Sequence, residues 1–286
     1  MSHFCVVVIG PDPEQQLAKY NENEPGPARW EPVRHYDIEE AERGLGITAL
    51  ANPALEHLEH LLAWMKENDS DEEYSIQDGE ICRKTTYNKF SKWDGYSVGG
   101  RWTGFFPLKK GKRGKKGEPG LMTKQATGQV ADQAKKGAID FEGARAGARE
   151  RAEKDWIAWE AILLEHGIPR NWNDVRGSYS NAEIDKARDV YHVQGAVQAS
   201  RELVGYMTDP VEHFGTDKAA FVQRQVDVTL TPYAMVRNGE WVERGTIGWF
   251  CMSSGDMAKE DWSVIVNKMY DETPDDTLLT LIDAHI

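Results

Sequence analysis

The segment from Trp93 to Phe106 constrains the fold most, because it combines five aromatic residues with four glycines and one arginine. Aromatic residues favour strands, whereas a glycine inside a strand usually marks a bulge or the close approach of a ligand or another backbone. Side chains of an extended chain alternate between two faces, which places Arg101 on the same face as Gly99. The pattern therefore predicts a strand that leaves room for a bound group beside Arg101.

Length and cysteine content point to one large domain or two modest ones without covalent cross-links. The chain has 286 residues, which is enough to bury a stable core. Its cysteines, Cys5, Cys82 and Cys251, are far apart and form no Cys-x-x-Cys pair, so neither a disulfide framework nor a thiolate zinc site is expected. The sequence has no signal-peptide pattern and no apolar run of membrane-spanning length. We therefore expect a cytoplasmic protein with no membrane partner.

The charge of the chain is acidic, with one exception. The formal net charge is −13, and a general duplex-DNA binder needs a positive surface, so we do not expect that function. Residues Lys109–Lys116 carry six positive charges in eight residues, which leaves the remainder of the chain near −19. This basic segment is either a solvated loop or a tether to nucleic acid or another polyanion.

The order of the predicted elements indicates an α+β fold. Apolar runs, helical stripes and the dipeptide Asn238-Gly239 are the signals for strands, helices and a β-hairpin. The predicted elements are strands at 4–9, 96–108 and 277–286, the hairpin at 233–243, and helices at 53–67, 144–166, from 180 onward and 257–270. Residues 75–87 are left unassigned. The order predicts an antiparallel or mixed sheet sandwich, in one version ferredoxin-like, with a helical insertion.

The same order predicts three regions along the chain. Residues 1–108 and 225–286 together are expected to form a sheet-containing core domain, because the predicted strands lie in these two segments. Residues 109–128 are rich in glycine and lysine and lack apolar periodicity, which is typical of a flexible loop. Residues 129–224 contain long amphipathic patterns and are expected to form the helical insertion.

Five segments of the chain carry a likeness to a known protein family. They are Gly-Gly-Arg-Trp-Thr-Gly-Phe-Phe at 99–106, Gly-Glu-Pro-Gly-Leu-Met at 117–122, Ala-Asp-Gln-Ala-Lys-Lys-Gly-Ala-Ile-Asp-Phe at 131–141, Glu-Arg-Gly-Thr-Ile-Gly-Trp-Phe at 243–250 and Pro-Asp-Asp-Thr-Leu-Leu-Thr-Leu-Ile-Asp-Ala-His-Ile at 274–286. In these segments the chain resembles a family of bacteriophage and prophage proteins for which no activity is established. The resemblance implies a phage setting and supplies neither a mechanism nor a catalytic residue. For that setting we hypothesise an accessory protein in the host cytoplasm that acts in host takeover or counter-defence. Similar proteins have cysteine where this chain has Ala284, so no thiol chemistry is expected there.

Arginine, glycine and tryptophan occur together twice, which predicts a pocket for an anionic ligand. A guanidinium group would bind phosphate or carboxylate oxygens while a neighbouring indole stacks on a ring. The residues proposed for ligand binding are Gly99, Gly100, Arg101, Trp102, Thr103, Arg244 and Trp249. Neither a Walker loop nor a Gly-x-Gly-x-x-Gly motif accompanies them. The alternative interpretation is two aromatic core strands whose arginines pair with acidic side chains.

Polar residues near the two chain ends are candidates for catalysis. Asp283 and His285 are two apart in the closing strand, so their side chains project from one face. If His3 of the opening strand lies beside them, the three residues could form a metal or acid–base site. Glu243, next to Arg244, is a third candidate catalytic residue. The alternative is a frayed terminus with solvated side chains.

Two further motifs have simpler explanations. His57 and His60 have a spacing that metal ligands can use, but the Leu-Glu-His repeat around them is typical of the polar face of an amphipathic helix. Cys251 is an isolated cysteine, which is more often a small buried hydrophobe than a nucleophile. The sequence identifies no cofactor.

The candidate residues support three functions from different classes. The first is a binding protein for an anionic small molecule, namely a nucleotide or a nucleotide-derived signal. The second is a phosphoesterase or nucleotide hydrolase that uses Asp283, His285 or Glu243, with the arginines stabilising the developing charge. The third is an acidic interaction protein that binds a host factor. The first function accounts for both arginine–tryptophan clusters, and the sequence itself does not choose between binding and catalysis.

Overall fold

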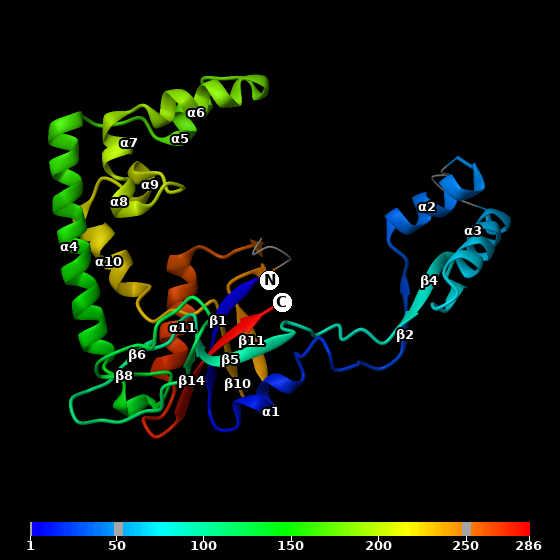
Figure 1. Ribbon diagram of the computed structural model, residues 1–286, viewed down its shortest axis with the longest axis horizontal. Coiled ribbons are helices and arrows are strands. Elements are labelled where there is room, and N and C mark those ends of the chain that lie inside the picture. Colours follow the sequence, from blue (N-terminus) through cyan, green and yellow to red (C-terminus); the bar gives the residue numbers. More distant parts are fainter. Residues whose placement is uncertain (1, 49–53, 248–252) are drawn as a thin grey trace. The chain divides into compact units, whose positions relative to one another are not determined.

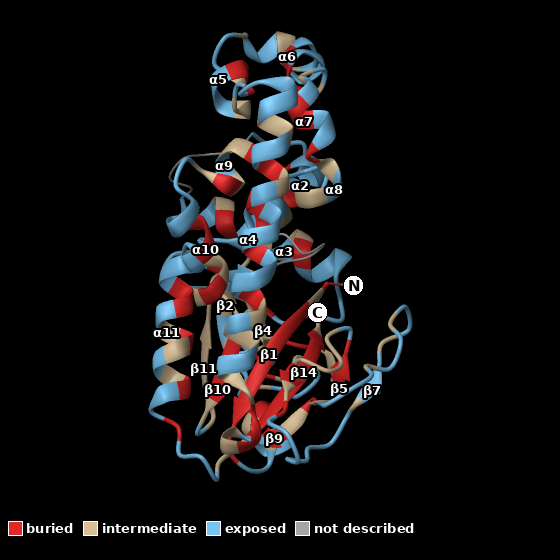
Figure 2. Ribbon diagram, turned by 90° about the vertical axis from the view of Figure 1, so that its left-hand side faces the viewer, coloured by how far each residue is buried: buried red, intermediate tan, exposed pale blue. Residues whose placement is uncertain are grey.

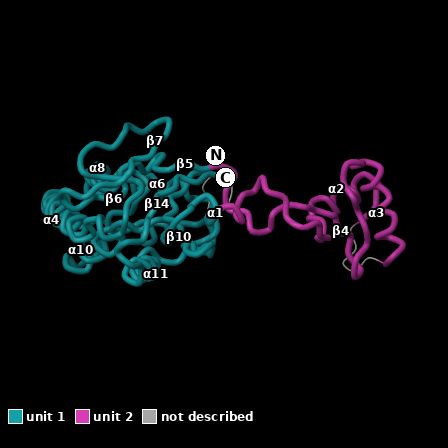
Figure 3. The backbone as a smooth tube through the Cα atoms, turned by 90° about the horizontal axis from the view of Figure 1, so that it is seen from below, with its two compact units in different colours: residues 1–16, 96–286 teal, residues 17–95 magenta. Residues whose placement is uncertain are grey.

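Two compact units make up the structure, which is a computed structural model (Figure 3). The residues that it describes are 2–48, 54–247 and 253–286. Unit 1 consists of residues 1–16 and 96–286, and unit 2 consists of residues 17–95. The predicted core domain includes residues 17–95, but in the structure these residues bury an apolar core of their own. The helices expected as a separate insertion belong to unit 1.

A mixed seven-stranded sheet forms the centre of unit 1 (Figure 1). Its strands, in spatial order, are β11 (Glu240–Glu243), β10 (Ala234–Arg237), β1 (His3–Ile9), β14 (Leu278–His285), β5 (Gly95–Gly100) and β7 (Glu118–Pro119), while β9 (Gln133–Lys135) also pairs with β14. Strand β1 runs antiparallel to β14 and parallel to β10, which brings the two ends of the chain together. The predicted α+β class with a mixed sheet is confirmed.

The strand order differs from that of a ferredoxin-like sheet, in which the first strand pairs with the second strand of the hairpin. Here β1 pairs with β10, the first strand of the hairpin, and β11 lies at the edge. Burial explains the difference, because Ala234–Val236 of β10 are completely buried whereas β11 begins with the exposed Glu240. An apolar strand takes an interior position, and a polar strand suits the edge.

The core of unit 1 lies between this sheet and helix α11 (Lys259–Asp271). Figure 2 shows that β1 and β14 are buried along most of their length. Trp262 and Tyr270 of α11 are also buried in this core, and both polar groups have partners. The Trp262 Nε1–H donates to the Pro232 carbonyl at 2.6 Å, and the Tyr270 hydroxyl donates to the Leu230 carbonyl at 3.0 Å. These bonds offset the cost of taking the polar groups out of water.

The middle of the chain is mostly helical. They are α4 (Phe141–His166), α5 (Trp172–Arg176), α6 (Ile184–His192), α7 (Gly195–Ala199), α8 (Arg201–Val204), α9 (Pro210–Phe214) and α10 (Lys218–Asp227). Helix α4 confirms the helix predicted at 144–166, and it starts three residues earlier because Asp140 caps it by accepting the Gly143 N–H at 2.9 Å. A second apolar cluster joins α4 to α9 and α10, where the rings of Trp159 and Phe214 stack with centroids 5.0 Å apart.

The helix predicted from Ser180 onward is not continuous. The Ser180 hydroxyl donates to the Glu183 carboxylate at 2.9 Å, and α6 begins only after that residue. The helix is interrupted again between α6 and α7, where Val193 is 69% exposed. Valine and the following Gly195 are weak helix formers, so the sequence near the break does not favour one long helix.

Short elements complete the described chain. They are α1 (Pro13–Ala18), β6 (Phe106–Pro107), β8 (Val130–Ala131), β12 (Thr246–Ile247), β13 (Ser253–Ser254) and single 3-10 turns at 136–138 and 181–183. Strand β6 pairs with β8, and β12 pairs with β13. Among the described helices, none is both long enough and apolar enough to cross a bilayer.

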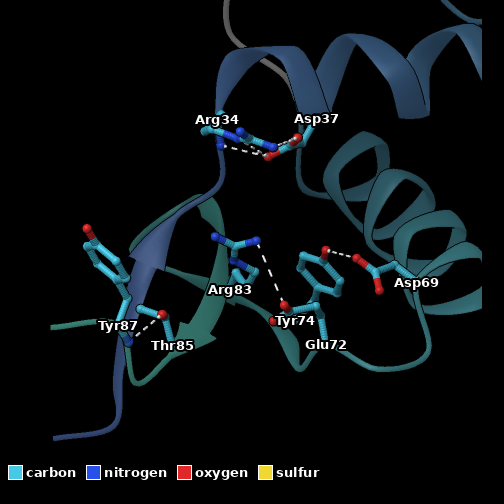
Figure 4. A network of polar contacts seen from close by, with 8 residues as sticks. All are labelled: Arg34, Asp37, Asp69, Glu72, Tyr74, Arg83, Thr85 and Tyr87. Carbon is cyan, nitrogen blue, oxygen red and sulfur yellow. Dashed lines mark hydrogen bonds and ion pairs between the residues drawn. The ribbon is translucent and has the colours of Figure 1, made fainter. Parts of the chain in front are cut away.

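Unit 2 contains a three-stranded antiparallel sheet and two longer helices. The strands, in spatial order, are β2 (Arg29–Pro32), β4 (Glu80–Thr85) and β3 (Tyr74–Gln77), and the helices are α2 (His35–Leu45) and α3 (Leu55–Asn68). Helix α3 confirms the helix predicted at 53–67. Its Leu61 packs with Ile81 of β4 in the core of the unit. Figure 4 shows polar contacts around this core, among them the Tyr74 hydroxyl, which donates to Asp69 at 2.9 Å.

Candidate functional site

The ends of β1 and β14 bring the polar residues of the two chain ends together. In the antiparallel register His3 lies opposite His285, and Cys5 lies opposite Asp283, so all four belong to one face of the sheet. The His3 and His285 rings have centroids 5.3 Å apart. The predicted trio therefore lies in paired strands. Within the described ranges, no group of three or more His, Cys, Asp or Glu side chains is arranged to hold a metal ion.

His3 and Asp283 form a close pair. The His3 Nδ1 lies 2.8 Å from Asp283 Oδ1, and the two side chains are 19% and 4% exposed. The other oxygen, Oδ2, accepts the backbone N–H of Arg101 at 2.8 Å. Because an ionised carboxylate can only accept hydrogen bonds, the proton of a neutral His3 is on Nδ1, and its Nε2 is left as an acceptor. The pair thus sets both the orientation and the tautomer of the imidazole.

The strand predicted through Arg101 ends in a tight turn. Strand β5 stops at Gly100, and the Trp102 N–H donates to the Gly99 carbonyl at 3.0 Å. Gly99 and Gly100 have φ values of +85° and +53°, a region that glycine adopts without steric cost. A Cβ on Gly100 would also overlap the carboxylate of Asp283. The two glycines therefore let the Arg101 N–H reach Asp283.

A second buried carboxylate, Asp132, holds the other side of this turn. Asp132 is completely buried and accepts the Thr103 hydroxyl at 3.0 Å, the Gly117 N–H at 2.8 Å and the Gly104 N–H. Several such donors together can stabilise a buried carboxylate. Residues 99–104 are thus fixed between two carboxylates that come from separate parts of the chain.

A cavity of about 600 Å³ lies next to the turn and the histidine–aspartate pair. Its wall combines aromatic rings with cationic side chains. Among the lining residues are His3, Trp102, Tyr233, Arg244, Lys259 and Trp262. The volume falls within the range of roughly 300–1,000 Å³ that is typical of small-molecule sites.

Two cationic side chains are among the described residues that line this cavity, and nearby acidic groups balance their charges to different extents. The Arg244 Nε–H donates to the Met257 carbonyl at 2.8 Å, and Nη2 lies 3.7 Å from Asp256 Oδ2, so its charge is partly balanced. Lys259 is exposed at the first position of α11, and no described carboxylate lies within 4.0 Å of its ammonium group. Glu260 and Asp261 in the first turn of α11 offset the partial positive charge of its N-terminus, so it is the two cationic side chains of the wall that favour an anion.

Two other groups in the wall are neutral at physiological pH. Burial, helped by the Asp256 carboxylate, raises the pKa of Tyr233 to about 12, so its hydroxyl remains protonated. Burial and the Asp283 carboxylate raise the pKa of the Cys5 thiol well above its ordinary value. A protonated thiol is a poor nucleophile, so Cys5 contributes an apolar surface and not reactivity.

The structure brings together some predicted ligand-binding residues and separates others. Trp102 and Arg244 line the same cavity, as expected for converging clusters. Arg101 does not line it, because its side chain is exposed and lies along the backbone at Gly120, where a Cβ would be 3.3 Å from the Arg101 Cγ. The expected pair of guanidinium groups is therefore replaced by Arg244 and Lys259. The predicted residues that fall outside the described ranges are Trp249 and Cys251.

The remaining candidates are not among the residues that line the cavity. Glu243, in β11, accepts the Nε1–H of Trp241 at 2.8 Å and does not line the cavity. In unit 2, His57 Nε2 lies 3.8 Å from the carboxylate of Glu42, whereas His60 is exposed. The two histidines of α3 therefore have different surroundings and do not share a site.

Sequence reasoning missed Lys259 and Asp132. The sequence holds no distinct signal for Lys259, because α10 also begins with a lysine and Glu260 and Asp261 follow Lys259 in the first turn of α11. Asp132 stands between Ala131 and Gln133 in a short polar and apolar alternation that resembles an ordinary edge strand. Only the fold shows that its carboxylate collects donors from residues 103–117.

Comparison of the chain with models of protein families, with curated proteins and with solved structures found no match. The geometry and charge of the cavity therefore indicate which ligands the protein can bind.

Proposed function

We propose that unit 1 binds an anionic small molecule with an aromatic ring, such as a nucleotide or a nucleotide-derived signal. The observation that carries this proposal is that Trp102, from the middle of the chain, lines one cavity of about 600 Å³ together with Arg244 and Lys259, from its last part. An indole can stack on a base while guanidinium and ammonium groups bind phosphate oxygens. A neutral sugar would gain little from the two cations, so the charge of the wall favours a phosphorylated ligand.

The proposed setting is a host cell infected by a phage. It is supported by the resemblance of five sequence segments to bacteriophage and prophage proteins. In that setting a protein that sequesters a nucleotide signal would lower its free concentration and act in counter-defence.

The two cations of the wall give the test of the binding proposal. Charge-assisted hydrogen bonds contribute roughly 1.5–3 kcal/mol each, so we expect Arg244→Gln and Lys259→Gln each to weaken the binding of AMP by at least about tenfold. Titration calorimetry measures both affinities. Lys110→Gln is the matched control, because Lys110 is an exposed cation outside the cavity.

Adenosine provides the second control, since it keeps the ring and lacks the phosphate. We expect it to bind at least about tenfold more weakly than AMP. Equal affinity for AMP and adenosine, or unchanged AMP binding in both charge variants, would rule out the proposed role of the cations.

We also propose that the basic segment Lys109–Lys116 contacts a polyanion. All six of its cationic side chains are exposed, and none lies within 4.0 Å of a described carboxylate. The segment is anchored, because the Lys115 N–H donates to the Gln133 carbonyl at 2.7 Å and the Lys116 Nζ donates to the Ala126 carbonyl at 2.9 Å. An anchored cluster of charges loses less conformational entropy on binding than a free chain does.

A further inference from the structure

The wall of the cavity contains an imidazole–carboxylate pair that ligand binding alone does not require. His3 lines the cavity, whereas Asp283 lies behind it at 4% side-chain exposure and is not part of the wall. Asp283 accepts from His3 Nδ1 at 2.8 Å and from the Arg101 N–H at 2.8 Å. A base whose second ring nitrogen is held by a buried carboxylate is the arrangement that general-base catalysis uses.

We propose that His3 is the general base of a phosphodiester hydrolase site in this cavity and that Asp283 is its positioning residue. The inference rests on the proposed function, because it requires a nucleotide-like ligand beside Trp102. The sequence predicted Asp283, His285 and Glu243 as catalytic residues and His3 as a member of an acid–base trio, and the inference assigns the chemistry to His3. Asp283 acts through His3, whereas His285 and Glu243 do not line the cavity.

The charge of the wall selects the substrate class. Lys259 supplies one positive charge, with no described carboxylate within 4.0 Å of its ammonium group, and Arg244 supplies a second that Asp256 partly balances. A phosphodiester carries one negative charge, and its charge grows to two as a nucleophile adds to phosphorus. Two cations therefore stabilise the transition state of a diester more than they stabilise the bound diester, which is the condition for catalysis. A nucleotide phosphodiester is therefore the expected substrate.

The reaction is hydrolysis by a water molecule. The neutral His3 Nε2 removes a proton from water as the water oxygen bonds to phosphorus, and the bond from phosphorus to the leaving ester oxygen breaks. The imidazolium formed on His3 then gives its proton to the leaving oxygen, which restores the neutral base. One water is consumed, and an alcohol and a phosphomonoester are released. Cys5 is not an alternative nucleophile, because its thiol is protonated.

The test substrate is thymidine 5′-(4-nitrophenyl phosphate), whose hydrolysis releases coloured 4-nitrophenolate. His3→Asn is the central variant, since the asparagine amide can still donate to Asp283 but has no basic nitrogen. General-base catalysis contributes roughly 10²–10⁴-fold, so we expect kcat to fall by at least about 100-fold with KM changed less than about threefold. His60→Asn is the matched control, because His60 is an exposed histidine in unit 2 and should leave the rate unchanged.

Two further variants separate a chemical role from a structural one. In His3→Ala, free imidazole added to the solution should restore part of the lost rate, which a merely destabilised protein would not show. Asp283→Asn should lower kcat by at least about tenfold with little change in KM, because an asparagine no longer fixes the correct tautomer. Circular dichroism of each variant checks that the fold is kept.

The outcomes distinguish this inference from the proposed function. Loss of turnover in His3→Asn with rescue of His3→Ala by imidazole supports the inference. Wild-type protein that binds AMP in calorimetry but does not turn over the diester overturns the inference and leaves the binding proposal standing. Turnover that survives His3→Asn, or turnover of 4-nitrophenyl phosphate in place of the diester, also overturns it. Failure to bind AMP together with absence of turnover overturns both.

Discussion

At the residue scale, the site depends on carboxylates that bind backbone N–H groups. Asp283 and Asp132 each lie near a turn whose glycines have positive φ, and each accepts N–H groups from it. Such contacts require the backbone to come within hydrogen-bond distance of a carboxylate, and any side chain at Gly100 would block this approach. The most constrained residues of the site are therefore glycines that carry no chemistry themselves.

Gly100→Ala should destabilise unit 1 strongly. The positive φ costs roughly 1–2 kcal/mol, and the overlap of the new methyl group with Asp283 adds roughly 1–3 kcal/mol. Urea denaturation measures the free energy of unfolding. Gly111→Ala is the matched control, because Gly111 has a φ of +78° but an added Cβ would have no atom within 4 Å. This variant should therefore lose only the free energy of unfolding that the positive φ costs. Equal losses in the two variants would mean that the contact with Asp283 is unimportant.

At the scale of elements, the basic segment Lys109–Lys116 is distinct from the cavity. It follows β6 and precedes β7, and none of its residues lines the cavity wall. The Arg101 side chain, which is exposed and lies along Gly120, is not part of the cavity wall either. A contact with a polyanion and the binding of a small ligand can therefore be altered separately.

A variant in which glutamine replaces four cations of the basic segment should no longer be retained on immobilised heparin at low salt, and its affinity for AMP should be unchanged. The four replaced residues are Lys112, Arg113, Lys115 and Lys116. Each contact with a polyanion releases counterions, so retention of the wild-type protein should fall steeply as salt rises. A control variant neutralises four cations that already have carboxylate partners. They are Arg34, Lys84, Lys154 and Lys186. Retention that drops equally in both variants would indicate a response to overall charge and not to the basic segment.

At the scale of the whole molecule, local signals predicted the elements better than their arrangement. The Asn238-Gly239 hairpin was predicted because both residues favour positive φ, and they have φ values of +55° and +74°. The same logic applies to Asp78-Gly79, which joins β3 and β4 and was not used, so residues 75–87 stayed unassigned. The order of the strands and the division into two units depend on long-range packing, which local periodicity does not contain.

The candidate site was predictable in part for the same reason. The joint occurrence of arginine, glycine and tryptophan predicted Trp102 and Arg244 as site residues, and the alternation of side chains along the closing strand predicted Asp283. Arg101 was assigned to the pocket on the assumption that the strand continues, whereas the turn at Gly100 redirects its side chain. His3 was predicted only as one member of a metal or acid–base trio, and Lys259 was not predicted at all. Their positions beside the cavity follow only from the pairing of β1 with β14 and the packing of α11.

The central claim is that the cavity beside Trp102 binds an anionic, ring-bearing ligand, and the most direct measurement is a crystal structure of the protein with AMP. The account predicts that the base lies against Trp102 and that the phosphate lies within hydrogen-bond distance of Arg244 and Lys259. AMP bound elsewhere on the chain, or an empty cavity at saturating AMP, would contradict it.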